Sequence, residues 1–90
     1  MKRVIISFLG KDAVGIIAKV CNYLASQNIG IMDISQTIVQ GYFNMMMIVD
    51  MSGATASFKE LQENMDIIGE QIGIQIKCQR EEIFDKMHRI

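Results

Sequence analysis

The order of two hydrophobic repeats along this chain limits the folds that it can adopt. Apolar residues that alternate with polar ones are typical of β-strands, and apolar residues spaced by three and four are typical of amphipathic helices. Strand patterns cover Lys2–Leu9, Ile29–Val39, Tyr42–Met51 and Ile74–Gln79, and helical patterns cover Val14–Gln27, Phe58–Ile72 and Glu81–Ile90. The predicted order is therefore strand, helix, strand, strand, helix, strand, followed by a short C-terminal helix.

Turn and capping signals separate these elements where the order requires them. Gln40-Gly41 lies between two strand patterns and predicts a two-residue β-hairpin. Ser57 followed by Glu60 is the capping-box pattern of a helix start, and Gly73 fits just beyond the end of the same helix. Asn28 tolerates left-handed geometry, so it marks the end of the first helix.

The strand and helix patterns also predict which side chains form the core. In the first strand, Val4, Ile6 and Phe8 share one face, which places this strand near the sheet centre. The second strand is predicted to have one apolar and one polar face. Its apolar face comprises Met32, Ile34 and Ile38, its polar face Asp33, Ser35 and Thr37, and the first helix buries Ile17, Val20, Cys21 and Leu24.

This order predicts an α+β, ferredoxin-like βαββαβ fold. Two helices cannot cover both faces of so small a sheet evenly, so both are expected on one face of a four-stranded antiparallel sheet. The 90 residues are predicted to form one domain, with a core over residues 1–80 and a helical tail over residues 81–90. Apolar residues on the uncovered face and on the tail predict a partner chain, and we expect a homodimer.

Composition excludes several classes of function. The net charge is −1 with both signs mixed, which argues against direct nucleic-acid or membrane-surface binding. No apolar run approaches the ~18 residues of a membrane span, so a cytoplasmic location is expected.

The reactive side chains of the sequence do not form a chemical site. Cys21 and Cys78 are far apart, and neither is at metal-ligand spacing from the single His88, so neither a metal nor another cofactor is expected. Both thiols are predicted to be buried and reduced. No nucleophile–base set can be assembled, which predicts that the chain is not an enzyme.

The segment that follows the first strand is the best candidate for binding. Its glycines turn the chain into a helix start, where backbone N–H groups can hold an anionic group. Asp12 can hold a cation or can simply cap the helix, and the glycines can serve turn and packing roles alone. A loop with both features suits a zwitterion such as an amino acid. The candidate residues here are Gly10, Lys11, Asp12, Ala13, Val14, Gly15 and Ile16.

This segment resembles the opening signature of ACT domains, which are βαββαβ modules that bind amino acids and other small ligands. The signature has a glycine, an Asp or Asn, often Arg-Pro, and a second glycine; Ala13-Val14 stands here in place of Arg-Pro. Further along, Met32–Ile38, Tyr42–Met46 and Ile83–Met87 are similar to the small single-domain ACT proteins grouped as UPF0237. Those proteins are similar to halves of the glycine cleavage system transcriptional repressor.

The resemblance implies a ligand site at a dimer interface. Asp12 would take the ligand ammonium, and backbone N–H groups near Val14 to Ile16 would take the carboxylate. The start of the second strand would also contribute, which adds Asn28 and Gly30 to the candidates; Gly30 stands where a polar residue, often Asn, is common. The implied function is non-enzymatic regulation through a small molecule, and the alternative is a docking module that has lost its ligand pocket.

Two rival interpretations fail on particular residues. RNA-binding sheets of the same topology carry Lys or Arg before a glycine and aromatics two positions apart, whereas here Gln40 precedes Gly41 and Asn44 replaces the second aromatic. The run Met45-Met46-Met47 cannot converge on one copper ion, because adjacent strand residues point to opposite faces. It predicts adaptable core and interface packing instead.

Overall fold

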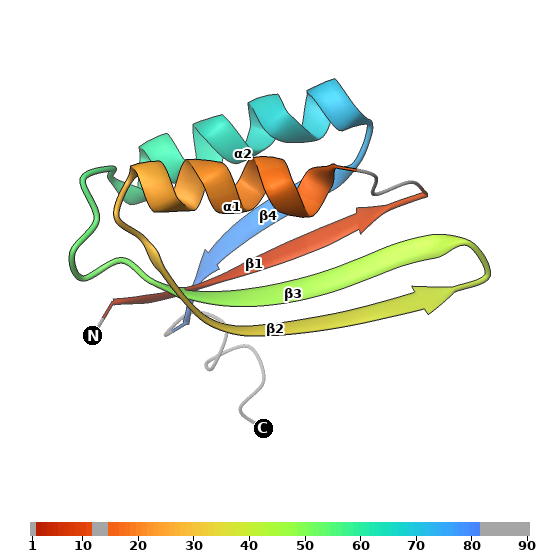
Figure 1. The fold of residues 1–90 in the computed structure, drawn as a ribbon, viewed down its shortest axis with the longest axis horizontal. Helices are drawn as coiled ribbons and strands as arrows, with labels where there is room; N and C mark the ends of the chain where they lie inside the picture. The colour runs from red at the N-terminus through yellow and green to blue at the C-terminus, as the bar shows by residue number, and fades with distance from the viewer. Residues whose placement is uncertain (1, 12–14, 82–90) are drawn as a thin grey trace.

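The computed structural model describes residues 2–11 and 15–81 and confirms the predicted order of elements. Four strands form one antiparallel sheet in the order β2-β3-β1-β4, and both helices lie on the same face of it (Figure 1). The strands are β1 (Arg3–Gly10), β2 (Gly30–Val39), β3 (Tyr42–Asp50) and β4 (Gln75–Arg80), and the helices are α1 (Ile16–Ser26) and α2 (Phe58–Ile72). The ferredoxin-like α+β architecture is therefore confirmed.

The core fills the space between the sheet and the two helices. Val4, Ile6 and Phe8 of the central strand β1 are buried there, as the alternation predicts. In β3, Met45 and Met47 are buried while Met46 is exposed, which confirms that the three methionines do not share a face. Other large members of the core include Ile16, Val20 and Leu24 from α1, Phe43 and Val49 from β3, and Leu61 and Met65 from α2.

Both ends of α2 are set by the residues that the sequence indicates. Ser57 and Glu60 form a reciprocal capping box: the Ser57 hydroxyl accepts from the Glu60 N–H at 3.1 Å, and the Glu60 carboxylate accepts from the Ser57 N–H at 3.1 Å. Gly73 ends the helix with a φ of 86°. Gly69 is buried in the last turns of the helix, and a Cβ there would lie 2.7 Å from the carbonyl oxygen of Ile74, too close for any side chain. The glycine thus lets the start of β4 pack directly on the helix.

The hairpin between β2 and β3 has the turn that its two residues predict. Gln40 has a φ of 51° and Gly41 a φ of 81°. Two consecutive positive φ values are the signature of the type I′ turn, whose twist matches that of the flanking strands.

The prediction for α1 is wrong in its start and in part of its buried stripe. The helix begins at Ile16 rather than Val14, and Ile16, Val20 and Leu24 are its buried residues. Ile17 is exposed and Cys21 is half-buried. The buried stripe is rotated toward Ile16 because α1 shares the sheet with α2 and has one flank free.

The predicted apolar face of β2, which comprises Met32, Ile34 and Ile38, is wrong in one residue, and none of its side chains is buried. Every residue of β2 is exposed, because this strand forms an edge of the sheet that the helices leave largely uncovered (Figure 1). A bulge shifts the register between Ile31 and Asp33. As a result Ile31, not Met32, lies on the same face as Ile34 and Ile38, opposite the buried residues of β3.

The two cysteines differ in their surroundings. Cys78 is buried, and burial together with the nearby charge of Asp66 raises the pKa of its thiol to about 12. Cys21 is only half-buried, so the prediction of two buried thiols is confirmed for Cys78 alone. The predicted C-terminal helix over residues 81–90 falls outside the described residues except for Glu81, and it stays a prediction.

Candidate ligand-binding site

The junction between β1 and α1 contains two glycines with different physical roles. Gly10 ends β1 against the turn before β4, where an added Cβ would lie 2.7 Å from Cβ of Ile74. Gly15 has a φ of 80° and open space around it. Gly10 therefore serves packing, and Gly15 gives the chain its left-handed entry into α1. Asp12, Ala13 and Val14 lie outside the described residues.

The start of α1 differs from the predicted capped helix. Its N-cap is Gly15, not Asp12, and the cap makes no side-chain hydrogen bond. The N–H groups of a first helical turn have no partners within the helix, and Gly15 has no side chain that could accept from them, so they are available to an acceptor from outside the helix. The side chain of Ile16 is in the core, so only the backbone of this residue can take part in binding.

Asn28 and Gly30 lie at the other end of the sheet. Gly30 pairs with Asp50, which pairs in turn with the first residue of β1, whereas Gly10 at the end of β1 lies opposite Phe43. The two groups of candidate residues are therefore separated by the length of the strands, roughly 20 Å at about 3.3 Å per residue. Within one chain, the structure does not bring them together (Figure 1).

Asn28 has a structural role that the sequence does not reveal. It has a φ of 56°, and its side-chain amide donates to the Gly53 carbonyl at 2.9 Å. This bond ties the connection between α1 and β2 to the loop after β3. Gly30 has no heavy atom within 4 Å of the position of an added Cβ, so its surroundings are open.

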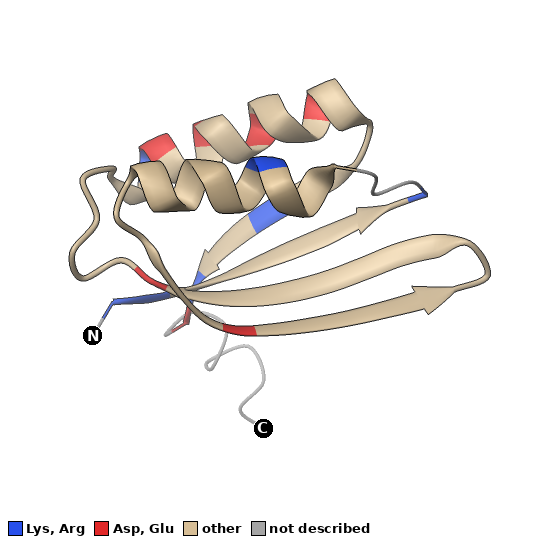
Figure 2. Cartoon of the chain, viewed as in Figure 1, with Lys and Arg blue, Asp and Glu red and all other residues tan. Residues whose placement is uncertain are grey.

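Charge is distributed unevenly around the candidate loop. Lys11 directly follows the end of β1, whereas acidic residues are spread along α2 (Figure 2). The Lys11 ammonium lies 5.7 Å from the ring centroid of Tyr42, within the range of a cation–π contact. This contact holds a positive charge beside the loop that enters α1.

An exposed apolar surface beside this loop was missed by the sequence analysis. Ile31, Ile34 and Ile38, here called the β2 stripe, are 41%, 43% and 67% exposed on the helix-bearing side of the sheet. On α1, the half-buried Tyr23 and the Lys19 ammonium, 3.4 Å from the Gln71 side chain, face α2. The helical spacing turns Ile17 and Cys21 to the opposite flank, above β2. Ile17 and Cys21, which are apolar but do not belong to the buried stripe of α1, were the sequence signal for this surface.

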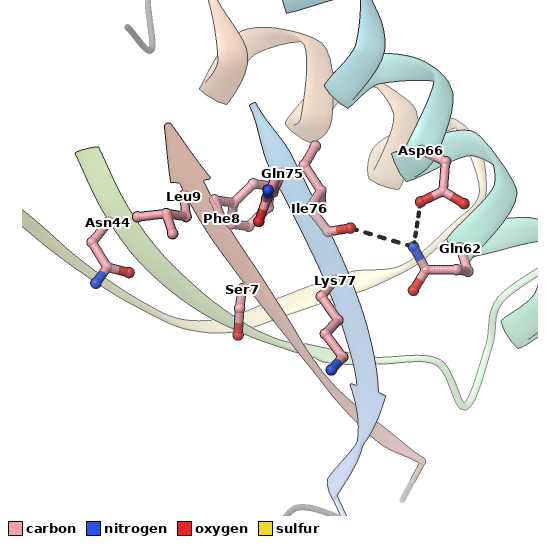
Figure 3. A pocket seen from close by; sticks show the side chains of 9 residues that line it. All are labelled: Ser7, Phe8, Leu9, Asn44, Gln62, Asp66, Gln75, Ile76 and Lys77. Atoms are coloured by element: carbon pink, nitrogen blue, oxygen red, sulfur yellow. Dashed lines mark hydrogen bonds between the residues drawn. The ribbon is translucent and has the colours of Figure 1, made fainter. Parts of the chain in front are cut away.

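Two hollows on the surface do not coincide with the predicted site. The first, about 540 Å³, lies at the β4 edge and is lined both by residues of α2 and by residues of the open side of the sheet, among them Ser7, Leu9, Gln62, Asp66 and Lys77 (Figure 3). The second, about 860 Å³, lies near the starts of β1 and α2. Neither hollow is lined by Gly10, Lys11, Gly15 or Gly30.

In the first hollow, Gln62 of α2 closes the edge of β4. Its side-chain carbonyl accepts from the Cys78 N–H at 2.8 Å. Its amide donates to the Ile76 carbonyl at 3.4 Å and to the Asp66 carboxylate at 2.8 Å (Figure 3). The side chain therefore takes the place of a neighbouring strand. The β2 edge has no such cover among the described residues.

Residues 2–11 and 15–81 contain no group of three His, Cys, Asp or Glu side chains that could hold a metal ion. Within the same ranges, neither helix has the length and apolar character needed to cross a membrane.

Comparisons with known proteins agree with this geometry. The ACT domain family profile matches residues 2–79. A UPF0237 protein of Bifidobacterium longum is 56% identical over 90 residues, which cover 100% of both chains. A solved ACT domain protein from Streptococcus pneumoniae has a TM-score of 0.79 and 35% identity, over 92% of this chain and 93% of that one.

A candidate glycine cleavage system transcriptional repressor shares the fold with a TM-score of 0.73 at 19% identity, over 88% of this chain and 45% of the repressor. The match to less than half of that protein agrees with the resemblance to one of its halves. Given the profile match and the full-length relatives, this chain belongs to the ACT-domain family and, within it, to the UPF0237 group.

Proposed function

We propose that this protein is a non-enzymatic regulatory module that binds a small molecule, an amino acid, between two copies of the chain. The observation that carries the proposal is the separation of the candidate residues. Gly10 lies at one end of the sheet and Gly30 at the other, with the open edge strand β2 running between the two ends.

Pairing of two β2 edges would bring the separated parts together. A two-fold axis that pairs a strand with its own copy makes the two strands antiparallel. The partner copy of Gly30 would then lie at the end of the sheet where Gly10 and Gly15 lie in the first chain. The site is incomplete within one chain, and the dimer would contain two complete copies of it, related by the two-fold axis.

The difference between the two sheet edges supports the use of β2. The β4 edge has its Cys78 N–H and Ile76 carbonyl occupied by Gln62, whereas β2 is exposed along its whole length. The β2 stripe and the free flank of α1 give the same side of the molecule an apolar surface. Open strand edges and contiguous apolar surface both favour association with another chain.

The chemistry of the α1 start suits a carboxylate. Backbone N–H groups without a side-chain cap and the positive end of the helix dipole both favour a negative group there. Lys11 adds a positive charge beside the loop. Asp12 would take the ammonium group of the same ligand, as the family resemblance implies, so that the loop would bind a zwitterion through backbone and side chain together.

A docking module without a ligand is the second candidate function. It is favoured by Gly30, which offers no side-chain polar group at the start of β2 where ACT domains often have one. RNA binding has less support, because Phe43 is buried in the core and leaves Tyr42 as the one aromatic that β3 exposes.

A thermal-shift screen of the twenty amino acids, combined with light scattering, tests the proposal. A ligand at about 100 times its Kd stabilises the folded state by about 2.7 kcal/mol. We expect a dimer and at least one amino acid that raises the Tm. Asp12→Ala should abolish that shift with a modest loss of stability, while Glu70→Gln, an exposed change on α2, should leave it intact.

The outcomes separate the two candidates. A dimer that responds to no amino acid, and in which Asp12→Ala changes stability alone, would favour the docking module. A monomer at millimolar concentration, with or without a ligand response, would contradict a site shared between two copies.

A further inference from the structure

The face of the sheet that the helices leave uncovered, here called the open face, is buried at one end and exposed at the other. Along β1, Ile5 is 4% exposed although it does not belong to the core cluster between sheet and helices. Leu9, on the same face, is 47% exposed. Because both lie on the central strand, the sheet itself does not account for the difference.

The buried end of the open face is the end at which the chain leaves β4. Ile5 is in register with Gln79, one residue before the end of that strand. Glu81 follows the last residue of β4, and its carboxylate lies 3.5 Å from the guanidinium of Arg3. Arg3 is two positions from Ile5 on β1 and therefore lies on the same face. This contact directs the departing chain toward the open face.

The residues that follow have the pattern and the length for a cover. Ile83, Phe84, Met87 and Ile90 recur at helical spacing and form one apolar stripe. A helix over residues 82–90 would be about 13 Å long, which equals roughly four residues of strand. A helix that begins beside Arg3, where Glu81 lies, ends near Ser7 and stops short of Leu9, as the exposure along β1 requires.

We propose that residues 82–90 of the same chain form an amphipathic helix that packs on the open face over Ile5 and Ile48. The helix gives the central strand a second apolar layer at this end. It also keeps two sheets from stacking through their open faces, so that the β2 edge is the surface left for pairing. This inference concerns a face that the proposed ligand site does not use, so it stands or falls independently of that site.

Tryptophan fluorescence tests the orientation of the helix, because the chain contains no tryptophan. In the F84W variant the new side chain belongs to the apolar stripe, and in the matched D85W variant it lies on the opposite side of the same helix. We expect F84W to emit at shorter wavelength and to be quenched less by acrylamide than D85W. Equal emission and equal quenching of the two folded variants would overturn the proposal.

Chemical crosslinking tests the location and the occupant. In a C21S background, where Cys78 stays protected by burial, S7C/M87C should be joined by a short bis-maleimide into a product of monomer mass. T37C/M87C, whose strand position lies on β2, should not be joined. A product of dimer mass would assign the cover to a second copy, and absence of the Ser7 crosslink would place it elsewhere; either result would overturn the proposal.

Discussion

At the scale of single residues, Gly10 is fixed by its neighbour across the β1–β4 pair. Gly10→Ala places a methyl group against the side chain and backbone of Ile74, so one of the two elements must shift. Overpacking of this kind costs about 1–3 kcal/mol. We expect the free energy of unfolding, measured by urea denaturation, to fall by that amount.

Gly30→Ala is the matched control for this change. Gly30 also lies in a strand, but it has nothing within 4 Å of an added Cβ and no positive φ. The replacement should be neutral or should stabilise the fold by about 0.5–1 kcal/mol, because alanine loses less backbone entropy on folding. Equal effects of the two substitutions would mean that the close contact at Gly10 does not limit this position.

Asp50 makes stability depend on pH in the acid range. The Ser52 hydroxyl donates to its carboxylate at 2.6 Å and the Ser52 N–H at 2.9 Å, and these bonds lower the pKa of Asp50 below its ordinary value. The folded state therefore favours the ionised carboxylate. The resulting stability is present above the pKa of the unfolded state and is lost as the pH falls through the lower folded pKa.

The measurement is an NMR titration of the Asp50 carboxyl carbon. We expect its pKa to lie below the ordinary aspartate value and to rise in Ser52→Ala, which removes the hydroxyl and keeps the backbone N–H. A midpoint at the ordinary value in the unmodified protein would show that the two bonds are not maintained in solution.

At the scale of elements, Gln62 links α2 to the edge of β4. Gln62→Ala leaves the Cys78 N–H without its partner, which costs about 1 kcal/mol or somewhat more. We expect a loss of stability of that size and faster hydrogen exchange at the Cys78 amide. Gln71→Ala, which removes an exposed contact to Lys19, is the control and should change neither quantity.

The pattern of hydrogen exchange across the sheet distinguishes closure of the β4 edge by Gln62 from a general contribution of this side chain to packing. If Gln62 acts by covering the edge, Gln62→Ala should accelerate exchange at Cys78 without a matching change in β2. Uniformly faster exchange throughout the sheet would indicate that the side chain only adds to global stability.

At the scale of the whole molecule, the β2 stripe decides how copies associate under the proposed function. Ile34→Lys places a charge where two β2 edges would meet, and an unpaired charge in an interface costs about 3 kcal/mol, or roughly a 100-fold rise in Kd. We expect light scattering to show a monomer at concentrations where the unmodified protein is a dimer. Ile67→Lys, on an exposed apolar residue of α2, should leave the dimer intact.

Elements with strong local signals were predicted well from the sequence. The capping box at Ser57, the left-handed Gly73 and the Gln40-Gly41 turn are set by residues within a few positions of each other, so their geometry follows from local backbone chemistry. The alternation in β1 placed Val4, Ile6 and Phe8 in the core for the same reason. These signals, with the order of the elements, were sufficient to give the fold.

Tertiary structure decided the features that the spacing of apolar residues along the sequence does not determine. The exposure of β2 depends on its place at the sheet edge, and the bulge that exchanges Met32 for Ile31 depends on pairing with β3. The candidate site illustrates the same limit: the family resemblance joined Gly30 to the loop that begins at Gly10, but the topology of a strand–helix–strand unit sends Gly10 and Gly30 to opposite ends of the sheet. Sequence by itself determined which elements form and in what order, because those choices are local; which edges stay open, and therefore what a second chain can complete, was decided only when the elements packed together.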